Sequence, residues 1–288
     1  MIISVASGKG GTGKTTITAS LASIWEAPLT VVDLDVEEPN LQFFVQPEIQ
    51  GSEPVHIEIP VVDESKCTAC GECSDLCQFK AITVMAGTVL TFPEMCHGCG
   101  GCMAVCPEGA IEPGERELGV MEWGRAGKAS YLMGRLRVGE AMSPPLMRVV
   151  KKRLFKELSE NGGDAIIDSP PGVSCPAVCA VMDSDFVVLV TEPTPFGFYD
   201  FKLAWEAFSG FGKPMGVVVN RAGLGDDEVE NFCREKNLPI LARVPFDRKI
   251  AEAYSRGELI AGLDGRVSQA LADLREGIRR GVKEASHA

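Results

Sequence analysis

The sequence of 288 residues has few positive charges and no long hydrophobic run, and each shortage excludes a class of protein. No apolar stretch approaches the roughly 18 residues that a membrane-spanning helix requires. Lys and Arg number 28 against 40 Asp and Glu, so the basic surface that nucleic-acid binding needs is missing. Residues 1–5 have no basic leader and no cleavage site, which predicts no signal peptide. We therefore expect a cytoplasmic protein that binds neither nucleic acid nor a membrane.

Cysteine, by contrast, is abundant, and its placement predicts a separate metal-binding module. The chain has 11 cysteines, which without a secretion signal indicate metal or redox chemistry rather than disulfides. Eight of them lie in residues 67–106, in two runs that repeat after 29 residues. Pro60 precedes this stretch and Pro113 follows it. We expect an inserted module at residues 60–115, between a first part at 1–59 and a second at 116–288.

Outside the module, the hydrophobic pattern predicts an α/β fold. Unbroken apolar runs, which indicate buried strands, lie at residues 2–6, 29–34, 164–168, 186–191, 215–219 and about 240–244. Helical patterns at 14–25, at 143–159 and between the later strands provide the crossovers of a mostly parallel sheet, flanked by helices on both faces. A last helix has Val267, Leu271, Leu274 and Ile278 on one face. We expect that face to pack on the sheet rather than on a membrane.

A phosphate-binding loop follows the first strand. Residues 8–15, GKGGTGKT, fit the pattern G-x-x-x-x-G-K-[ST] between a strand and a helix. The glycines let backbone N–H groups surround phosphate oxygens, and the helix N-terminus adds positive charge. Lys14 is expected to reach the β- and γ-phosphates of ATP, and Thr15 to bind Mg²⁺. The residues expected to hold the nucleotide are Gly8, Lys9, Gly10, Gly11, Thr12, Gly13, Lys14, Thr15 and Thr16.

Further segments make the chain resemble the MinD/ParA group of deviant Walker A ATPases, which includes the nitrogenase iron protein. Lys9 is the second lysine within the loop that marks this group. Residues 33–40, DLDVEEPN, look like its switch I, and residues 168–172, DSPPG, look like its Walker B segment and switch II. Residues 220–221 look like its adenine-recognition segment. The resemblance implies an ATP-hydrolysing P-loop NTPase domain, formed by residues 1–59 and 116–288, that is active as a dimer.

The resemblance also implies roles for single residues. Lys9 would contact the nucleotide of a partner subunit, and Asp35 would orient the attacking water. Asp33 and Asp168 would support Mg²⁺, although a strand-end carboxylate that caps a turn is the alternative for Asp33. Asn220 would hydrogen-bond adenine. The implied catalytic residues are Lys9, Lys14, Asp35 and Asp168.

The two cysteine runs match the two-cluster pattern of bacterial ferredoxins, C-x₂-C-x₂-C-x₃-C. In that pattern one run provides three ligands of a cluster and the other run provides the fourth. One [4Fe-4S] cluster is then expected on Cys67, Cys70, Cys73 and Cys106, and a second on Cys96, Cys99, Cys102 and Cys77. Zinc is the alternative, but two full runs with identical spacing favour clusters in a ferredoxin-like α+β insert. His97 is expected to be a solvated turn histidine.

An ATPase of this type with an inserted ferredoxin resembles the ferredoxin-containing ATPases of the MinD superfamily. The resemblance implies a homodimer or a heterodimer with a paralogue, and a metallocofactor or redox acceptor protein as partner. Two mechanisms stay open: assembly or delivery of a metal cluster, and ATP-gated electron transfer. A positioning switch such as MinD or ParA is a third possibility, but it would leave eight cysteines unexplained.

Two more cysteines lie beyond the switch II segment. Cys175 comes seven residues after Asp168, the offset at which the nitrogenase iron protein and its relatives carry a ligand of a dimer-bridging cluster. The resemblance therefore implies a third, bridging cluster on Cys175 and Cys179. The alternative is two small buried apolar residues near a helix start. Cys233 is expected to be structural.

Overall fold

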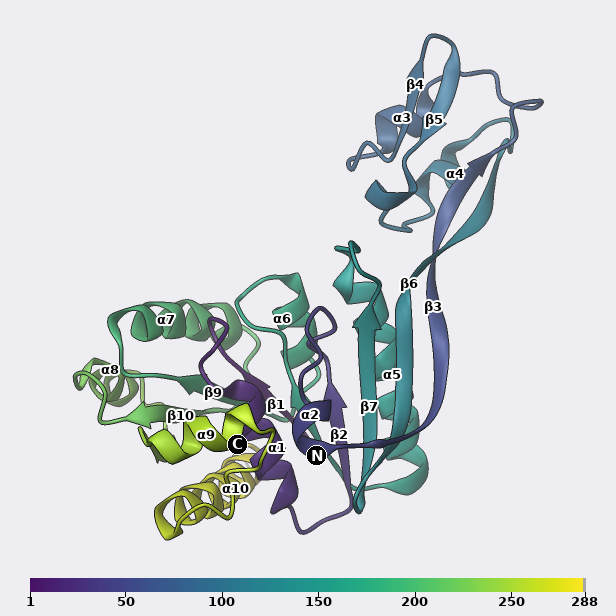
Figure 1. Ribbon diagram of the computed structural model, residues 1–288. Coiled ribbons are helices and arrows are strands. Elements are labelled where there is room, and N and C mark those ends of the chain that lie inside the picture. The colour runs from purple at the N-terminus through teal and green to yellow at the C-terminus, as the bar shows by residue number, and fades with distance from the viewer. Residues whose placement is uncertain (287–288) are drawn as a thin grey trace. The chain divides into compact units, whose positions relative to one another are not determined.

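The computed structural model describes residues 1–286, and the chain divides into two compact units. The first unit contains Met1–Ser52, Met121–Arg135 and the chain from Met147 onward. The second contains Glu53–Val120 and Leu136–Leu146. The predicted insert at residues 60–115 lies within the second unit. Figure 1 labels the elements of both units.

The main sheet of the described residues, 1–286, has nine strands in the order β11-β10-β9-β1-β8-β2-β7-β6-β3. Its strands are β1 (Ile2–Ala6), β2 (Leu29–Asp33), β3 (Glu48–Val62), β6 (Ile111–Ala126), β7 (Ala129–Leu136), β8 (Asp164–Asp168), β9 (Phe186–Thr191), β10 (Met215–Ala222) and β11 (Ile240–Pro245). All neighbours from β11 to β7 pair in parallel. The six predicted strands and the mostly parallel α/β fold are thus confirmed.

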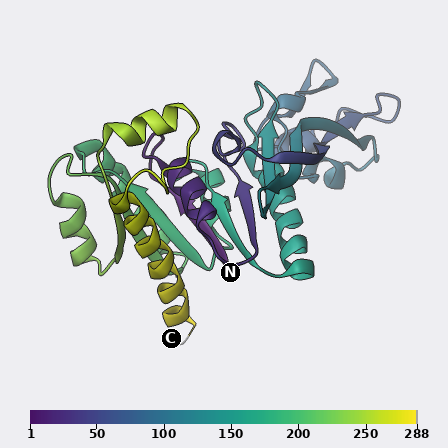
Figure 2. The ribbon, with the colours of Figure 1, turned by 60° about the horizontal axis from the view of Figure 1, so that its bottom comes forward.

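Helices cover both faces of this sheet (Figure 2). The helices are α1 (Lys14–Ser23), α2 (Gln42–Val45), α5 (Ser143–Asn161), α6 (Cys175–Val181), α7 (Pro195–Ser209), α8 (Glu228–Glu235), α9 (Arg248–Ser255) and α10 (Gly265–Ala285). Successive strand residues point to opposite faces, so Val188 packs with α1 and α10 whereas Leu189 packs with α6, α7 and α8. The central strands are therefore buried along nearly their whole length, which explains the mainly apolar runs in the sequence.

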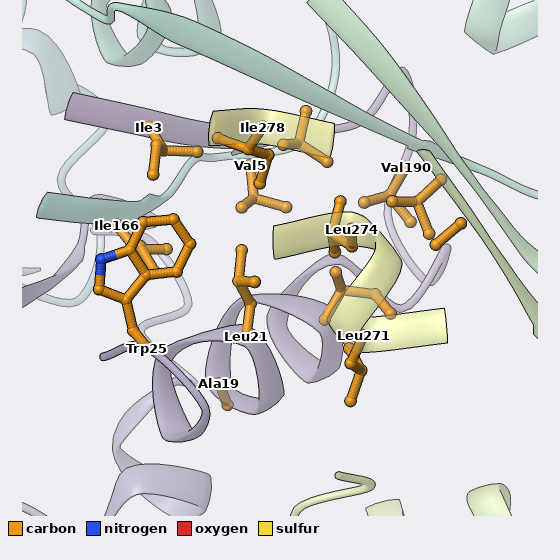
Figure 3. Close-up of a cluster of buried hydrophobic side chains, with 14 of the residues drawn as sticks. Ile3, Val5, Ala19, Leu21, Trp25, Ile166, Val190, Leu271, Leu274 and Ile278 are labelled. Carbon is orange, nitrogen blue, oxygen red and sulfur yellow. The ribbon is translucent and has the colours of Figure 1, made fainter. Parts of the chain in front are cut away.

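The last helix, α10, packs on the sheet as predicted. Leu271, Leu274 and Ile278 are fully buried in one apolar core with Ile3 and Val5 of β1 (Figure 3). No helix in the described part of the chain combines the length and the hydrophobicity that crossing a membrane requires.

Three strands of the nine-stranded sheet, β3, β6 and β7, were not predicted from the sequence. The first two are long and run from one unit into the other. β3 is the edge strand and most of its side chains are exposed, whereas β6 lies between β3 and β7 and contains Pro113 and Gly114. Their alternating and interrupted patterns therefore hide the strand signal that buried strands show. β6 and β7 are joined by only two residues, so these neighbours form an antiparallel hairpin.

The second unit contains two short helices, each preceded by a glycine in the left-handed conformation. α3 (Glu72–Leu76) follows Gly71, and α4 (Gly101–Val105) follows Gly100. Between them lie a hairpin of β4 (Ile82–Met85) and β5 (Thr88–Thr91) and a 3₁₀ turn, η1 (Pro93–Met95). The Asp63 N–H donates to the Ala110 carbonyl at 2.7 Å, which brings the two ends of the cysteine-rich stretch together.

Candidate functional sites

The loop between β1 and α1 depends on glycine at several positions. Gly11 and Gly13 have φ angles of 77° and 89°, in the left-handed region that favours glycine. A Cβ on Gly13 would lie 2.3 Å from the Asn220 amide nitrogen, and one on Gly8 would lie 2.0 Å from the Asp200 carbonyl oxygen. Side chains at these positions would therefore displace the loop from its neighbours.

Asp168, at the end of β8, is hydrogen-bonded to three polar side chains of α1. Its carboxylate accepts hydrogen bonds from Lys14 Nζ at 3.0 Å, Thr15 Oγ1 at 2.7 Å and Thr18 Oγ1 at 2.9 Å. Asp35 Oδ2 lies 3.8 Å from the same Lys14 nitrogen. Burial alone would lower the pKa of Lys14, but the charges of Asp168 and Asp35 outweigh it and raise that pKa. The lysine is therefore held in its charged form.

Asp33 is fully buried and organises the turn that follows β2. Its two oxygens accept hydrogen bonds from the backbone N–H groups of Asp35 at 3.1 Å and Leu41 at 2.9 Å. These contacts correspond to the turn-capping alternative, and a role of Asp33 toward Mg²⁺ stays a prediction. Burial raises the pKa of Asp33 well above its usual value, and burial also raises the pKa of Asp35 to about 6. Protonation of Asp35 is therefore within reach of mildly acidic pH.

Asn220 lies against the phosphate-binding loop. Its Nδ2 donates to the Thr12 carbonyl at 2.7 Å, and its Oδ1 accepts from the Arg221 N–H at 2.9 Å. A carboxamide can donate two hydrogen bonds and accept two, so these contacts leave capacity for a purine. The adenine contact stays a prediction, and the contact with the loop is an additional one that the sequence did not reveal.

A cavity of about 370 Å³ connects this loop to an apolar wall. Lys14, Thr15 and Asp35 line one part of it, and Phe246 and Tyr254 line another. The Thr12 hydroxyl on the loop is buried and has no hydrogen-bond partner within residues 1–286. A buried hydroxyl of this kind suits a phosphate oxygen, and aromatic side chains suit a purine. The cavity and its donors therefore fit a nucleotide with Mg²⁺.

Lys9 contacts an acidic residue that the sequence did not single out. Its Nζ lies 2.5 Å from Glu192 Oε1, and Arg221 lies 2.5 Å from the other oxygen of the same carboxylate. Glu192 is 183 residues away from Lys9 in the sequence and follows β9. No local motif marks it, so only the fold could reveal this contact.

The eight clustered cysteines line two cavities in the second unit. One cavity, of about 270 Å³, is lined by Cys77, Cys96, Cys99 and Cys102. The other is lined by Cys67, Cys70, Cys73 and Cys106. Each cavity therefore takes three cysteines from one run and one from the other, in the pairing that the ferredoxin pattern predicts. Within residues 1–286, no three His, Cys, Asp or Glu side chains are grouped to hold a single metal ion. Four thiols match the ligand number of a [4Fe-4S] cluster and also that of a structural zinc ion, and the spacing of the two runs favours the cluster.

Backbone donors surround the cysteine sulfurs in the same way in both runs. The first cysteine of each run, Cys67 or Cys96, accepts at 3.4 Å from the N–H two residues on. The last, Cys77 or Cys106, accepts at 3.3 Å from the N–H four residues on. Such N–H groups stabilise thiolates and tune a bound cluster. His97 is exposed as predicted, but it also stacks on Phe79 beside the cavity, with ring centroids 3.4 Å apart.

Cys175 and Cys179 lie on α6, four residues apart, and Cys175 is exposed. They are therefore not the two buried apolar residues of the alternative interpretation, and a third cluster there stays a prediction. Cys233 is buried in an apolar core with Phe201 and Val229, which confirms its structural role.

Comparison with known proteins shows the family of the chain. The family described as the CobQ/CobB/MinD/ParA nucleotide binding domain, CbiA, matches residues 3–260. The chain belongs to this family. The MinD/ParA assignment agrees with the geometry, because the phosphate loop, Asp35, Asp168 and Asn220 all follow or end parallel strands, β1, β2, β8 and β10. Ligands of open α/β sheets bind at this carboxyl edge.

Relatives and solved structures extend this result. Two proteins of Methanocaldococcus jannaschii, the uncharacterized proteins MJ0578 and MJ0579, are 33% and 29% identical to the chain. The alignments cover 97% of this chain and 96% of MJ0578, and 90% of both chains for MJ0579. The Pyrococcus furiosus cell division ATPase MinD shares the MinD/ParA fold, with a TM-score of 0.58 at 22% identity over 97% of this chain and 98% of its own. An iron-sulfur cluster carrier protein of Methanococcus maripaludis is 28% identical over 36% of this chain and 42% of its own length.

Proposed function

We propose that the protein is an ATP-hydrolysing, dimeric iron–sulfur protein in which nucleotide-driven switch motion serves assembly or delivery of a metal cluster to a partner protein. The observation that carries this proposal is the presence of a P-loop cavity and two four-cysteine cavities in one chain. A MinD/ParA nucleotide-binding domain provides the first. A ferredoxin needs no ATP, and a positioning ATPase needs no cysteines. The presence of both kinds of site in one chain therefore favours a function in which ATP hydrolysis is coupled to the clusters.

At the nucleotide, the side chains provide position and charge. Lys14 reaches the β- and γ-phosphates, Thr15 and Asp168 hold Mg²⁺, and Asp35 orients the attacking water. A lysine from the partner subunit, Lys9, adds positive charge at the transferred phosphoryl group. Mg²⁺ supplies neutralisation of phosphate charge. Phosphoryl transfer requires little beyond such positioning and charge stabilisation.

In the second unit, the two sets of cysteines hold two [4Fe-4S] clusters. Cys67, Cys70, Cys73 and Cys106 hold one, and Cys77, Cys96, Cys99 and Cys102 hold the other. The clusters supply one-electron transfer when bound. The backbone N–H groups on the first and last cysteine of each run stabilise the thiolates that bind iron.

Assembly or delivery is preferred to electron donation because of one comparison. The similarity to an iron-sulfur cluster carrier protein covers part of the chain and favours a carrier role. ATP-gated electron transfer to an acceptor is the second candidate, since two clusters suit it equally. A positioning switch is disfavoured by the eight cysteines. Strong ATP-dependent co-sedimentation with anionic vesicles would revive it.

The dimer partner is a second copy of the chain or a paralogue. Two relatives of similar coverage occur in one organism, which supports a heterodimer as readily as a homodimer. Cys175 and Cys179 of two subunits would together offer four thiols, the number that one bridging [4Fe-4S] cluster requires.

The first experiment is to measure iron per chain after anaerobic reconstitution, together with ATP hydrolysis. We expect about eight irons per chain from two ferredoxin clusters, and about four after Cys73→Ala. Cys233→Ala is the matched control, because its thiol lines neither cysteine cavity. Iron that does not fall in Cys73→Ala, or zinc at one ion per run, would contradict the cluster assignment.

The bridging cluster has its own experiment. It would add about two irons per chain, and Cys175→Ala should lose only that excess. Eight irons in both the wild type and Cys175→Ala would eliminate the bridging cluster and leave the two ferredoxin clusters untouched.

A further inference from the structure

Glu192 joins two cations that border the nucleotide loop. Its side chain is only 6% exposed, and its two oxygens lie 2.5 Å from Lys9 Nζ and 2.5 Å from Arg221. The other guanidinium nitrogen of Arg221 donates to the Gly11 carbonyl at 3.2 Å. Lys9 and Arg221 both line the nucleotide cavity, whereas Glu192 does not line it. The positive charge on this side of the cavity is thus tied to one buried carboxylate.

The surroundings of Glu192 fix its position. Thr194 Oγ1 donates to it at 3.3 Å and also caps α7 by accepting from the Gly197 N–H at 3.1 Å. A Cβ on Gly197 would lie 2.6 Å from Glu192 Cγ, so a glycine is required beside it. Burial raises the pKa of Glu192, but the bonds and charges of Lys9 and Arg221 outweigh it and lower that pKa. The carboxylate therefore stays charged and immobile.

We propose that Glu192 is a positioning residue that restrains Lys9 within its own subunit, and so sets how readily the ATP-bound chain pairs with a second copy of itself. The inference rests on the proposed function in one respect, the contact of Lys9 with the nucleotide of the partner. An ammonium group ion-paired to a buried carboxylate has to leave it before it can reach across a dimer interface. The strength of the Lys9–Glu192 pair is then subtracted from the free energy of dimerisation.

The test is Glu192→Gln, which keeps the shape and an acceptor but removes the charge. Sedimentation velocity with Mg²⁺ and a non-hydrolysable ATP analogue gives the protein concentration at half dimerisation. We expect this concentration to fall about tenfold in Glu192→Gln. Glu206→Gln, an exposed charge change on α7, is the matched control and should not shift it. An unchanged or higher concentration in Glu192→Gln would overturn the inference.

A second pair of variants separates restraint of Lys9 from a general structural effect. In a Lys9→Ala background, Glu192→Gln should no longer favour the dimer. A tenfold gain that persists without Lys9, or a dimer absent from every variant, overturns the inference. Binding of a fluorescent ATP analogue to dilute protein tests the proposed nucleotide site independently. Binding without the expected dimerisation shift removes only the role of Glu192, whereas loss of binding in the wild type removes the proposed function.

Discussion

Three carboxyl groups surround Lys14, which provides a single positive charge. Asp168 lies 3.0 Å from its nitrogen and Asp35 lies 3.8 Å away, while buried Asp33 adds a third carboxyl to the same cluster. Carboxylates that share a buried site disfavour one another's ionised forms. The site is therefore built to accept further positive charge, as Mg²⁺ and a lysine from a partner would provide.

Asp35→Asn should stabilise the chain near neutral pH. Its pKa is about 6 in the fold against an ordinary 3.8, so between these pH values the folded state binds more protons than the unfolded state. Stability due to this group is therefore lost as pH rises through that window. We expect the variant to be more stable by about 3 kcal/mol above pH 6 and no different at about pH 3. Thermal unfolding across this range, with Asp273→Asn as the control for charge, measures the difference. A stability difference between the two proteins that does not change with pH would contradict the raised pKa of Asp35.

Residue spacing revealed some parts of the sites and could not reveal others. The P-loop residues and the two cysteine runs are recognisable because each is a short motif of closely spaced residues. Glu192, by contrast, meets Lys9 only because β9 and β1 are neighbours in the sheet. The stacking of Phe79 on His97 likewise depends on how two separate cysteine runs pack. Contacts between segments that are distant in the sequence leave no motif from which they could be predicted.

At the scale of elements, burial on both faces decided what the sequence could predict. β1, β8 and β9 lie in the middle of the sheet and read as unbroken apolar runs. β3 is its edge strand and β6 lies next to β3, and both contain several exposed and charged residues. For them, pairing with neighbouring strands rather than hydrophobicity defines the strand, so composition alone did not predict it.

Leu274→Ala should destabilise the first unit. Leu274 is fully buried between α10 and the sheet, so its removal leaves a cavity as well as lost apolar contacts. We expect the free energy of unfolding to fall by about 3 kcal/mol. Glu276→Ala, an exposed position on the same helix, should change it by less than about 0.5 kcal/mol. Equal effects in denaturant titration would show that α10 does not pack on the sheet in solution.

At the scale of the whole molecule, the cysteine-rich stretch should be removable. Its ends meet where Asp63 donates to Ala110 at 2.7 Å, and β3 and β6 are neighbours in the sheet. Replacing residues 64–109 by Asn-Gly would close a two-residue hairpin. We expect the shortened chain to lose the irons of the two ferredoxin clusters, about eight per chain, to unfold cooperatively and to bind an ATP analogue within about threefold of the full chain.

The control for this deletion is the full chain with Cys73→Ala, which loses ligands but no backbone. Loss of nucleotide binding in the shortened chain alone would mean that the second unit supports the fold of the first. Loss of nucleotide binding in both variants would instead show that nucleotide binding depends on the bound iron.

The exchange of cysteines between the two runs has a consequence for ancestry. Each cavity obtains its fourth cysteine from the other run, so a single run by itself would leave its set of ligands incomplete. A peptide with one run would have had to associate with a second copy, each lending the other one thiol. Duplication within one chain would have made that exchange permanent. The 29-residue repeat is the spacing that such a duplication would leave in the sequence.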